Sequence, residues 1–273
     1  MDFLMETIPR IPPLVIMRDT QFCVCGSGYD THLWLAPHIM RCSNAFIIYD
    51  PDGSLKKQYG KTFNCNGYNI KVLNTAKVRM STRYNPFEYI RSDKDIPKLV
   101  NALITGTKGN GSPGDINFIT AETMLLTALI SYINNEAPKI EQNIITLILM
   151  LEYMKPDDDY EDDYEYKHAV DYLFEEKETY DPDHLSLRQY KNFKEMTGAD
   201  TKNIIASCAA RLAPFNTEEI KDFMSNDELE LDWLHFPNTV LFVIPGNAGS
   251  PFNFIVPLMY SQLFDVIGEK SVQ

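Results

Sequence analysis

The sequence predicts an α/β fold in which an open parallel sheet is interrupted by a helical subdomain. Three short apolar runs, rich in β-branched and aromatic residues, end in turn signals at 21–25, 45–50 and 69–74. Such runs are typical of buried parallel strands. A long stretch without strand signals follows, and a fourth run at 238–246 then restores the strand pattern. We therefore expect one sheet whose strands flank an inserted block of helices.

The first two strands are expected to be joined by a short crossover helix at 31–42, which Pro37 interrupts or begins. After the third strand, a helix at 92–106 opens with a capping-box pattern from Ser92 to Asp95 and closes at glycine.

The inserted block is predicted to be helical to about residue 225. The helix at 115–138 places apolar residues on one face, and the helix at 141–154 is apolar nearly all round and is expected to be buried. Four more helices are predicted at 168–178, 185–196, 201–215 and 217–224, and a last one at 251–268 follows the fourth strand.

Charge and composition limit the function classes. Lysine and arginine number 25 against 38 acidic residues, so the net charge is 25 − 38 = −13. This balance argues against direct nucleic-acid binding by the chain alone, because such affinity comes largely from basic side chains that neutralise phosphates. The longest apolar run, 144–151, is too short to span a bilayer, and the N-terminus lacks the basic region of a signal peptide. Five cysteines favour free thiols, so we expect a cytoplasmic protein without membrane insertion.

Residues 25–31, CGSGYDT, have the glycines of a phosphate-binding loop but not its lysine. Gly26, Ser27 and Gly28 supply a flexible turn, and Thr31 offers a hydroxyl for magnesium. If one residue has been lost, Asp30 stands in place of the lysine; if none has, Thr31 does. The residues alone leave a structural turn, a degenerate nucleotide site and an active one all open.

Other candidate ligands predict no metal site. Cys23 and Cys25 have a C-x-C spacing that is not a usual zinc motif, and strand alternation explains them equally well. His168, His184 and His235 lack cysteine or serine partners in any recognisable motif, so they are expected to cap or pack helices.

Seven further segments are collinear with one family: 45–55, 67–74, 84–104, 121–133, 181–216, 227–234 and 252–265. The chain resembles the conjugative coupling proteins of type IV secretion systems, of the TraG/TraD type, over about residues 20–268. Members of that family are membrane-anchored hexameric ATPases, which bring relaxase-bound DNA to a secretion channel.

The resemblance implies part of a RecA-like P-loop NTPase sheet with an inserted all-helical subdomain. The expected divisions are an N-terminal extension at 1–19, RecA-like parts at 20–90 and 237–273, and the helical domain at 91–236. Within that domain, the block of acids and tyrosines at 155–166 is expected to be a solvated loop.

The chain departs from the family at the residues that carry the chemistry. The family loop resembles GGSGSGKT, and its second motif resembles DPKGEL, whereas residues 50–55 read DPDGSL. Asp52 thus replaces a lysine and Ser54 a glutamate, and PGNAGSP stands near 245–250 in place of an acid-rich turn. The strand with the hydrolytic Asp-Glu pair and the arginine that acts across subunits are expected after residue 268, so the resemblance predicts a truncated chain without an anchor before residue 20.

These departures predict a relative of coupling proteins that has lost ATPase activity and acts as a protein-interaction module. Its partner would be a relaxase, an accessory factor or a full-length coupling protein. No catalytic residue and no cofactor is expected; the relic of the nucleotide site comprises Gly26, Ser27, Gly28, Asp30, Thr31, Asp50 and Gly53. The alternative is a nucleotide-binding component that binds Mg-ATP weakly and is completed in trans by another subunit.

Overall fold

A parallel sheet in the order β1-β2-β4-β3 forms one end of the molecule. The computed structural model describes residues 22–24, 45–107, 116–155, 167–232, 238–247, 250 and 252–270. In this part of the chain the strands are β1 (Phe22–Val24), β2 (Phe46–Tyr49), β3 (Asn69–Asn74) and β4 (Thr239–Ile244). The α/β class and the four strands are confirmed.

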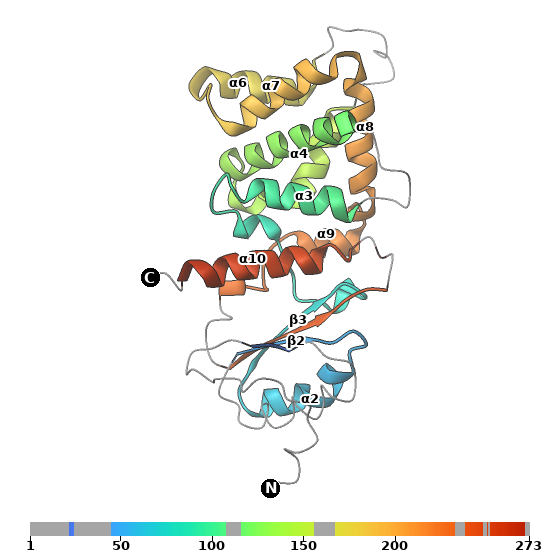
Figure 1. Ribbon diagram of the computed structural model, residues 1–273, viewed down its shortest axis with the longest axis vertical. Coiled ribbons are helices and arrows are strands. Elements are labelled where there is room, and N and C mark those ends of the chain that lie inside the picture. Colours follow the sequence, from blue (N-terminus) through green and yellow to red (C-terminus); the bar gives the residue numbers. More distant parts are fainter. Residues whose placement is uncertain are drawn as a thin grey trace.

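The strand that follows the helical block lies in the middle of the sheet (Figure 1). Phe46 of β2 pairs with Val240 of β4, and Asn69 of β3 pairs with Thr239 on the other side. The chain therefore leaves the sheet after β3, forms the helices α3 to α9, and returns as β4, which lies between β2 and β3.

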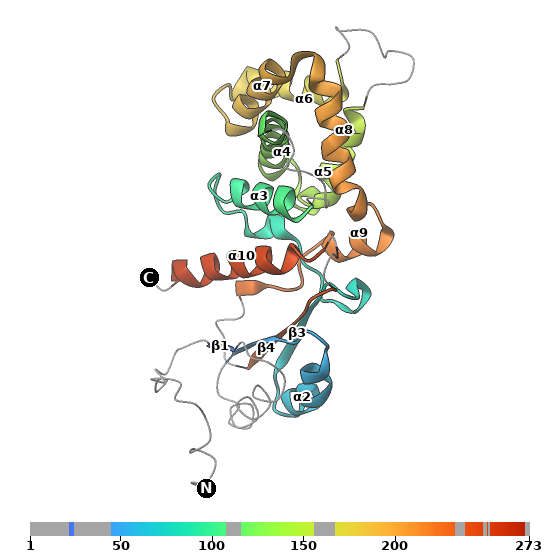
Figure 2. The ribbon, with the colours of Figure 1, turned by 45° about the vertical axis from the view of Figure 1, so that its right-hand side comes forward.

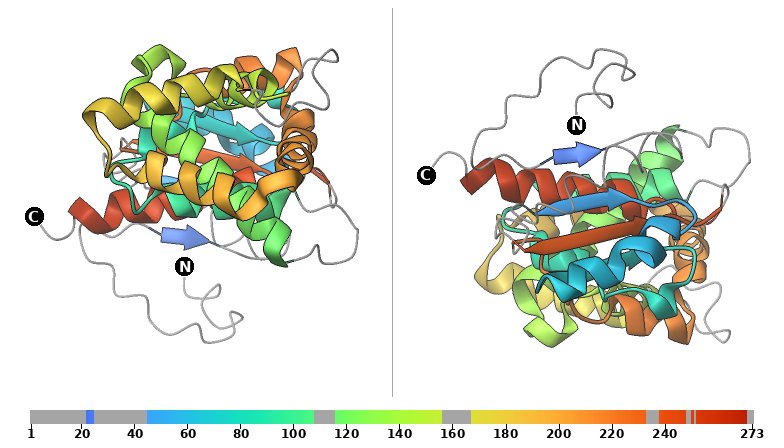
Figure 3. Two further views of the ribbon diagram at one scale, coloured as in Figure 1. Left: turned by 90° about the horizontal axis from the view of Figure 1, so that it is seen from above. Right: turned by 90° about the horizontal axis from the view of Figure 1, so that it is seen from below.

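The two faces of the sheet are covered by different helices, α2 (Ser54–Cys65) and α10 (Ile255–Lys270). Side chains alternate along β4, so Val240 and Phe242 pack in the cluster with α2, while Leu241 and Val243 pack with α10 and the helical block. Figure 3, seen from below, shows α2 in front of the strands and α10 behind them. Burial on both faces explains the continuous apolar run of this strand.

The helix α2 was not predicted from the sequence. It is mostly polar, and only Leu55 and Phe63 are buried. Phe63 is fully buried in an aromatic group with Phe46, Tyr68 and Phe242, at centroid distances of 4.9–5.9 Å. Because only two of its twelve residues are buried, the apolar periodicity of this helix is weak. Tertiary contacts, chiefly those of Phe63, stabilise it instead.

The helical block extends away from the sheet beyond α10 (Figures 1 and 2). Its helices are α3 (Ile96–Gly106), α4 (Ile116–Glu136), α5 (Ile144–Tyr153), α6 (Ala169–Tyr180), α7 (Leu185–Thr197), α8 (Thr201–Leu212) and α9 (Glu218–Met224). Short 3₁₀ turns lie at 78–80, 86–89, 139–141, 198–200 and 213–215. One core runs from the sheet face that carries Leu241 and Val243 through these helices. The domain limits expected at 90 and 236 stay predictions.

The predictions for three helices, α3, α5 and α4, need correction. The first helix of the block begins at Ile96 rather than Ser92, although the Asp95 carboxylate does accept hydrogen bonds from the Ser92 N–H and hydroxyl, both at 3.1 Å. α5 is not buried all round, since Leu149 is 45% and Tyr153 67% exposed. The crossover helix expected at 31–42 and residues 156–166 of the acidic loop expected at 155–166 lie outside the described residues.

The helix α4 is buried on nearly all sides rather than on one face. Leu126 and Ile130 are buried as well as Leu125 and Leu129, and these four residues point to different sides of the helix. Among the described helices α4 is the one long and apolar enough to cross a membrane by length and composition, with a mean hydropathy of 1.5. Contacts with α3, α5, α7 and α8 surround it, so its apolar character is that of a central core helix.

A glycine at the end of α3, Gly106, lies close against Phe254, the residue before α10. A Cβ atom on Gly106 would lie 2.0 Å from Phe254 Cβ and 2.4 Å from Phe254 Cγ. We expect Gly106→Ala to lower the free energy of unfolding by about 1–3 kcal/mol, because the buried ring cannot move without disturbing Phe215. Urea unfolding measures this change.

The matched control for that variant is Gly60→Ala in α2. No atom lies within 4 Å of the position of a Cβ on Gly60. This control should raise stability by about 0.5–1 kcal/mol, because alanine is the better helix former. Equal effects at the two glycines would contradict the packing argument.

Candidate functional site at the carboxyl edge of the sheet

The carboxyl ends of all the described strands meet at one edge of the sheet, since every pair is parallel. Ligands of open α/β sheets bind outside this edge. Of the predicted relic of a nucleotide site, Asp50 and Gly53 follow β2 at this edge. Gly26, Ser27, Gly28, Asp30 and Thr31 lie outside the described residues, so their predicted role is untested.

The Asp50 side chain holds the beginning of α2. Its carboxylate is fully buried and accepts two backbone N–H groups, from Leu55 at 3.1 Å and from Lys56 at 2.8 Å. The Asp50 N–H donates to the Val243 carbonyl of β4 at 2.8 Å. The carboxylate thus occupies the end of the helix where an anion would otherwise bind.

Gly53 and Asp52 complete this turn. Gly53 has φ of 73°, a left-handed conformation that glycine adopts without strain, and its N–H donates to the Asp50 carbonyl at 3.2 Å. Asp52 is exposed, and its carboxylate accepts the Ser54 N–H at 3.1 Å. Hydrogen bonding from Ser54 lowers the pKa of Asp52 below its usual value, so this turn carries negative charge toward solvent at pH 7.

The ends of β3 and β4 are tied to each other by residues that the sequence did not single out. The Thr75 N–H donates to the Ile244 carbonyl, and the Gly246 N–H donates to Thr75 Oγ1, each at 2.9 Å. Asn74 Oδ1 accepts the N–H groups of Ala76 and Lys77 at 3.1 and 2.8 Å. The available signal was a pair of polar residues, Asn74 and Thr75, at the end of an apolar run; both are buried.

These contacts satisfy backbone donors of the described edge from within the chain. The first turn of α2 donates to Asp50, and Gly246 donates to Thr75. A cradle of free N–H groups for phosphate is therefore not formed by these two turns.

No group of three or more His, Cys, Asp or Glu side chains comes together among the described residues. Cys65 is exposed and Cys208 is buried, both as free thiols, and burial raises the pKa of Cys208 well above its usual value.

Both described histidines cap helices, as predicted. His168 precedes α6, and its N–H donates to Asp171 Oδ2 at 2.8 Å. His184 precedes α7, and its Nδ1 accepts the Ser186 N–H at 3.2 Å. His235 lies outside the described residues.

The Asp171 carboxylate links α6 to α7 and makes stability depend on pH. Burial raises the pKa of Asp171, but the ion pair with Lys194 at 2.8 Å and the hydrogen bond from the Tyr190 hydroxyl at 2.8 Å outweigh burial. The net pKa lies below its ordinary value. The folded state therefore gains stability from Asp171 above the unfolded pKa, and this gain is lost as the pH falls through the lower folded pKa.

We expect the stability difference between wild type and Asp171→Asn to shrink as the pH falls below about 4. Urea unfolding at a series of pH values measures it. Lys194→Met should remove much of the same pH-dependent difference, because it removes the main charged partner. A difference that stays constant with pH would contradict this assignment.

The fold and this edge together define the class: an α/β protein with an open parallel sheet and an inserted block of helices. The family model described as "Type IV secretory system Conjugative DNA transfer" matches residues 24–271, so the chain belongs to this family. A comparison with curated proteins found no match.

A similar solved structure is that of a bacterial conjugative coupling protein, TrwBdeltaN70 in an unbound monoclinic form. The two share 15% sequence identity with a TM-score of 0.50. The match covers 86% of this chain and 47% of that one, so this chain spans about half the length of its structural relative. At this identity the likeness supports the fold, and it agrees with the resemblance seen in the sequence.

Proposed function

We propose that this chain takes part in conjugative DNA transfer as a cytoplasmic protein-interaction module that does not hydrolyse ATP. Family membership supports the conjugative setting. The single observation that carries the absence of hydrolysis is the turn after β2, where Asp52 exposes a carboxylate at the position that lysine has in the family motif DPKGEL.

Charge also makes the loss of the lysine from the loop at 25–31 costly for a nucleotide. At about 4 Å and an effective dielectric constant near 20, each pair of unit charges is worth roughly 4 kcal/mol before screening. Replacing lysine by aspartate beside a phosphate exchanges attraction for repulsion. If Asp30 stands at the lysine position of the loop at 25–31, it repels the phosphate. If Thr31 stands there, the attraction of the lysine is lost but no repulsion is added.

The helical block is the part of the chain that we assign to interaction. It keeps a complete core around α4, and the sequence segments that resemble the family are longest there. The partner would be a relaxase, an accessory factor or a full-length coupling protein.

Titration of the purified chain with ATP and Mg²⁺ by calorimetry tests the proposal, with inorganic phosphate as control. We expect no binding tighter than about 100 µM, which corresponds to roughly −5.5 kcal/mol. Asp52→Lys combined with Asp30→Lys or Thr31→Lys should strengthen ATP binding if the turns descend from a nucleotide site. The two double variants also separate the two possible alignments of the loop.

Two results would overturn the proposal. One is ATP hydrolysis by the chain that Asp30→Ala or Thr31→Ala abolishes. The other is tight Mg-ATP binding only after a full-length coupling protein is added, which would support the alternative of a site completed in trans.

A further inference from the structure

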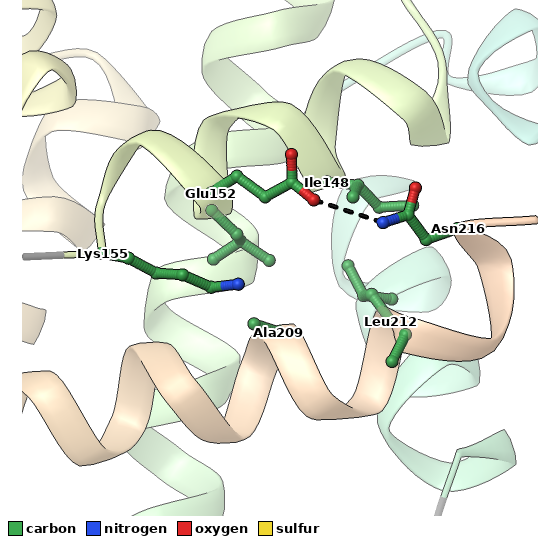
Figure 4. A pocket seen from close by; sticks show the side chains of 8 residues that line it. Ile148, Glu152, Lys155, Ala209, Leu212 and Asn216 are labelled. Carbon is green, nitrogen blue, oxygen red and sulfur yellow. Dashed lines mark hydrogen bonds between the residues drawn. The ribbon is translucent and has the colours of Figure 1, made fainter.

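A small pocket lies between α5 and α8, on the helical block and away from the sheet (Figure 4). Its floor is apolar and consists of Ile148, Leu151 and Leu212, all buried. Ala209 and Ala213 line it with methyl groups. Its polar lining comes from Glu152, Lys155 and Asn216.

Two polar groups of the lining have opposite character. The Glu152 carboxylate is held by a hydrogen bond from Asn216 Nδ2 at 3.2 Å, which links α5 to the turn after α8. Lys155 contributes an ammonium group across the pocket from Asn216 (Figure 4). A hydrogen-bond acceptor and a donor therefore flank an apolar floor. A peptide group, which offers one N–H and one C=O, suits such a pair.

The size of the pocket limits its occupant. Its volume is about 90 Å³, well below the roughly 300–1,000 Å³ of pockets that hold small-molecule ligands and cofactors. This space suits one aliphatic side chain. Anchor side chains that fill such pockets carry much of the energy of protein interfaces.

Apolar surface continues beside the pocket. Leu149 and Tyr153 lie one turn apart on the adjoining face of α5, and they are 45% and 67% exposed. A polypeptide anchored in the pocket would cover these side chains as well.

Charge decides which kind of polypeptide is favoured. Glu152 and Lys155 offset each other at the pocket, so the longer-range field comes from the rest of the chain. The net charge is −13, and the sequence directly after Lys155 carries seven acidic residues between 157 and 165. Such a field attracts and orients a positively charged partner.

We propose that the pocket between α5 and α8 binds a basic segment of a protein partner, which inserts one aliphatic side chain against Ile148, Leu151 and Leu212. This proposal rests on the proposed function, because it gives the interaction module a defined contact surface and the partner a stated chemistry.

Selection from a display library of random 12-residue peptides against the full chain tests this inference. We expect the selected peptides to share one leucine, isoleucine, valine or methionine with lysine or arginine close to it. Replacing that aliphatic residue by serine should weaken binding at least tenfold in a fluorescence anisotropy titration.

Two matched pairs of protein variants locate the site. Ala213→Leu fills the pocket and should weaken binding at least tenfold, whereas Ala210→Leu, on an exposed position of α8 outside the pocket, should not change it. Glu152→Lys should weaken binding, whereas Glu195→Lys, the same charge reversal on an exposed position of α7, should have a smaller effect.

The inference fails if no peptide is selected, if the selected peptides are acidic or lack an aliphatic anchor, or if Ala213→Leu binds them as wild type does. Unfolding curves of each variant show whether it is folded. If Ala213→Leu does not fold, the surface variant Glu152→Lys still tests the inference. A chain that hydrolyses ATP yet selects basic aliphatic peptides would overturn the proposed function alone.

Discussion

Replacing Arg211 by alanine is expected to lower the free energy of unfolding by about 3–5 kcal/mol, because it leaves a buried carboxylate without its cationic partner. The carboxylate belongs to Glu122 of α4, which is fully buried in the helical block. Arg211 of α8 donates from Nε to both carboxylate oxygens at 2.9 Å, and its Nη2 lies 2.8 Å from Oε2. Urea unfolding followed by circular dichroism measures the loss.

The same arginine also reaches the end of α3, since Nη1 donates to the Ile104 carbonyl at 3.4 Å. The Ser207 hydroxyl donates to Glu122 Oε1 as well. Removal of the guanidinium would leave Glu122 with this one neutral donor. The loss therefore combines an unpaired buried charge with a weaker link between three helices.

Two controls separate burial from simple ion pairing. Arg79→Ala breaks an exposed pair with Glu219 and should cost no more than about 1 kcal/mol. The double variant Glu122→Met and Arg211→Met should recover most of the loss, because well-packed apolar side chains can replace a buried ion pair. A cost at Arg211 as small as that at Arg79 would show that Glu122 finds another partner or water.

This ion pair illustrates what the sequence could not reveal. The periodicity of apolar residues predicted α4 and α8 as helices, because that signal is local. Glu122 and Arg211 are 89 positions apart, and the sequence around either residue does not indicate that the other is its partner. An acidic residue within a largely apolar helix was visible in the sequence, but its partner depends on how the helices pack.

The strands show the opposite case. The run at 69–74 was predicted with the bounds that the structure has, because its apolar, β-branched residues end at clear turn residues. The central position of β4 was not predicted, since strand order depends on contacts between distant segments. The predicted site residues at 26–31 lie outside the described residues, so their nucleotide role stays a prediction.

Replacing Asp50 by alanine is expected to lower the free energy of unfolding by about 2–4 kcal/mol, because it removes a helix cap and leaves two N–H groups without their acceptor. Both donors, from Leu55 and Lys56, begin α2, whose residue Phe63 fills the outer face of the sheet. Loss of the cap should therefore also weaken the aromatic core beneath the helix. Thermal and urea unfolding measure the change.

Asp52→Ala is the matched control in the same turn. Asp52 is exposed and accepts one N–H, from Ser54, so its loss should cost no more than about 1 kcal/mol. Asp50→Asn should fall between the two, because the amide keeps one acceptor oxygen for the helix.

The pair of variants also separates a structural role of Asp50 from a role in binding nucleotide. If Asp50 serves α2 alone, Asp50→Asn changes stability while ATP titrations of the folded protein stay as in wild type. If Asp50 also contacts a nucleotide, Asp50→Asn changes the affinity for ATP as well as the stability. Asp52→Lys should then change that affinity further in the same direction. A stable Asp50→Ala protein would contradict the cap itself, since the buried carboxylate would then have no structural reason to lie between β2 and α2.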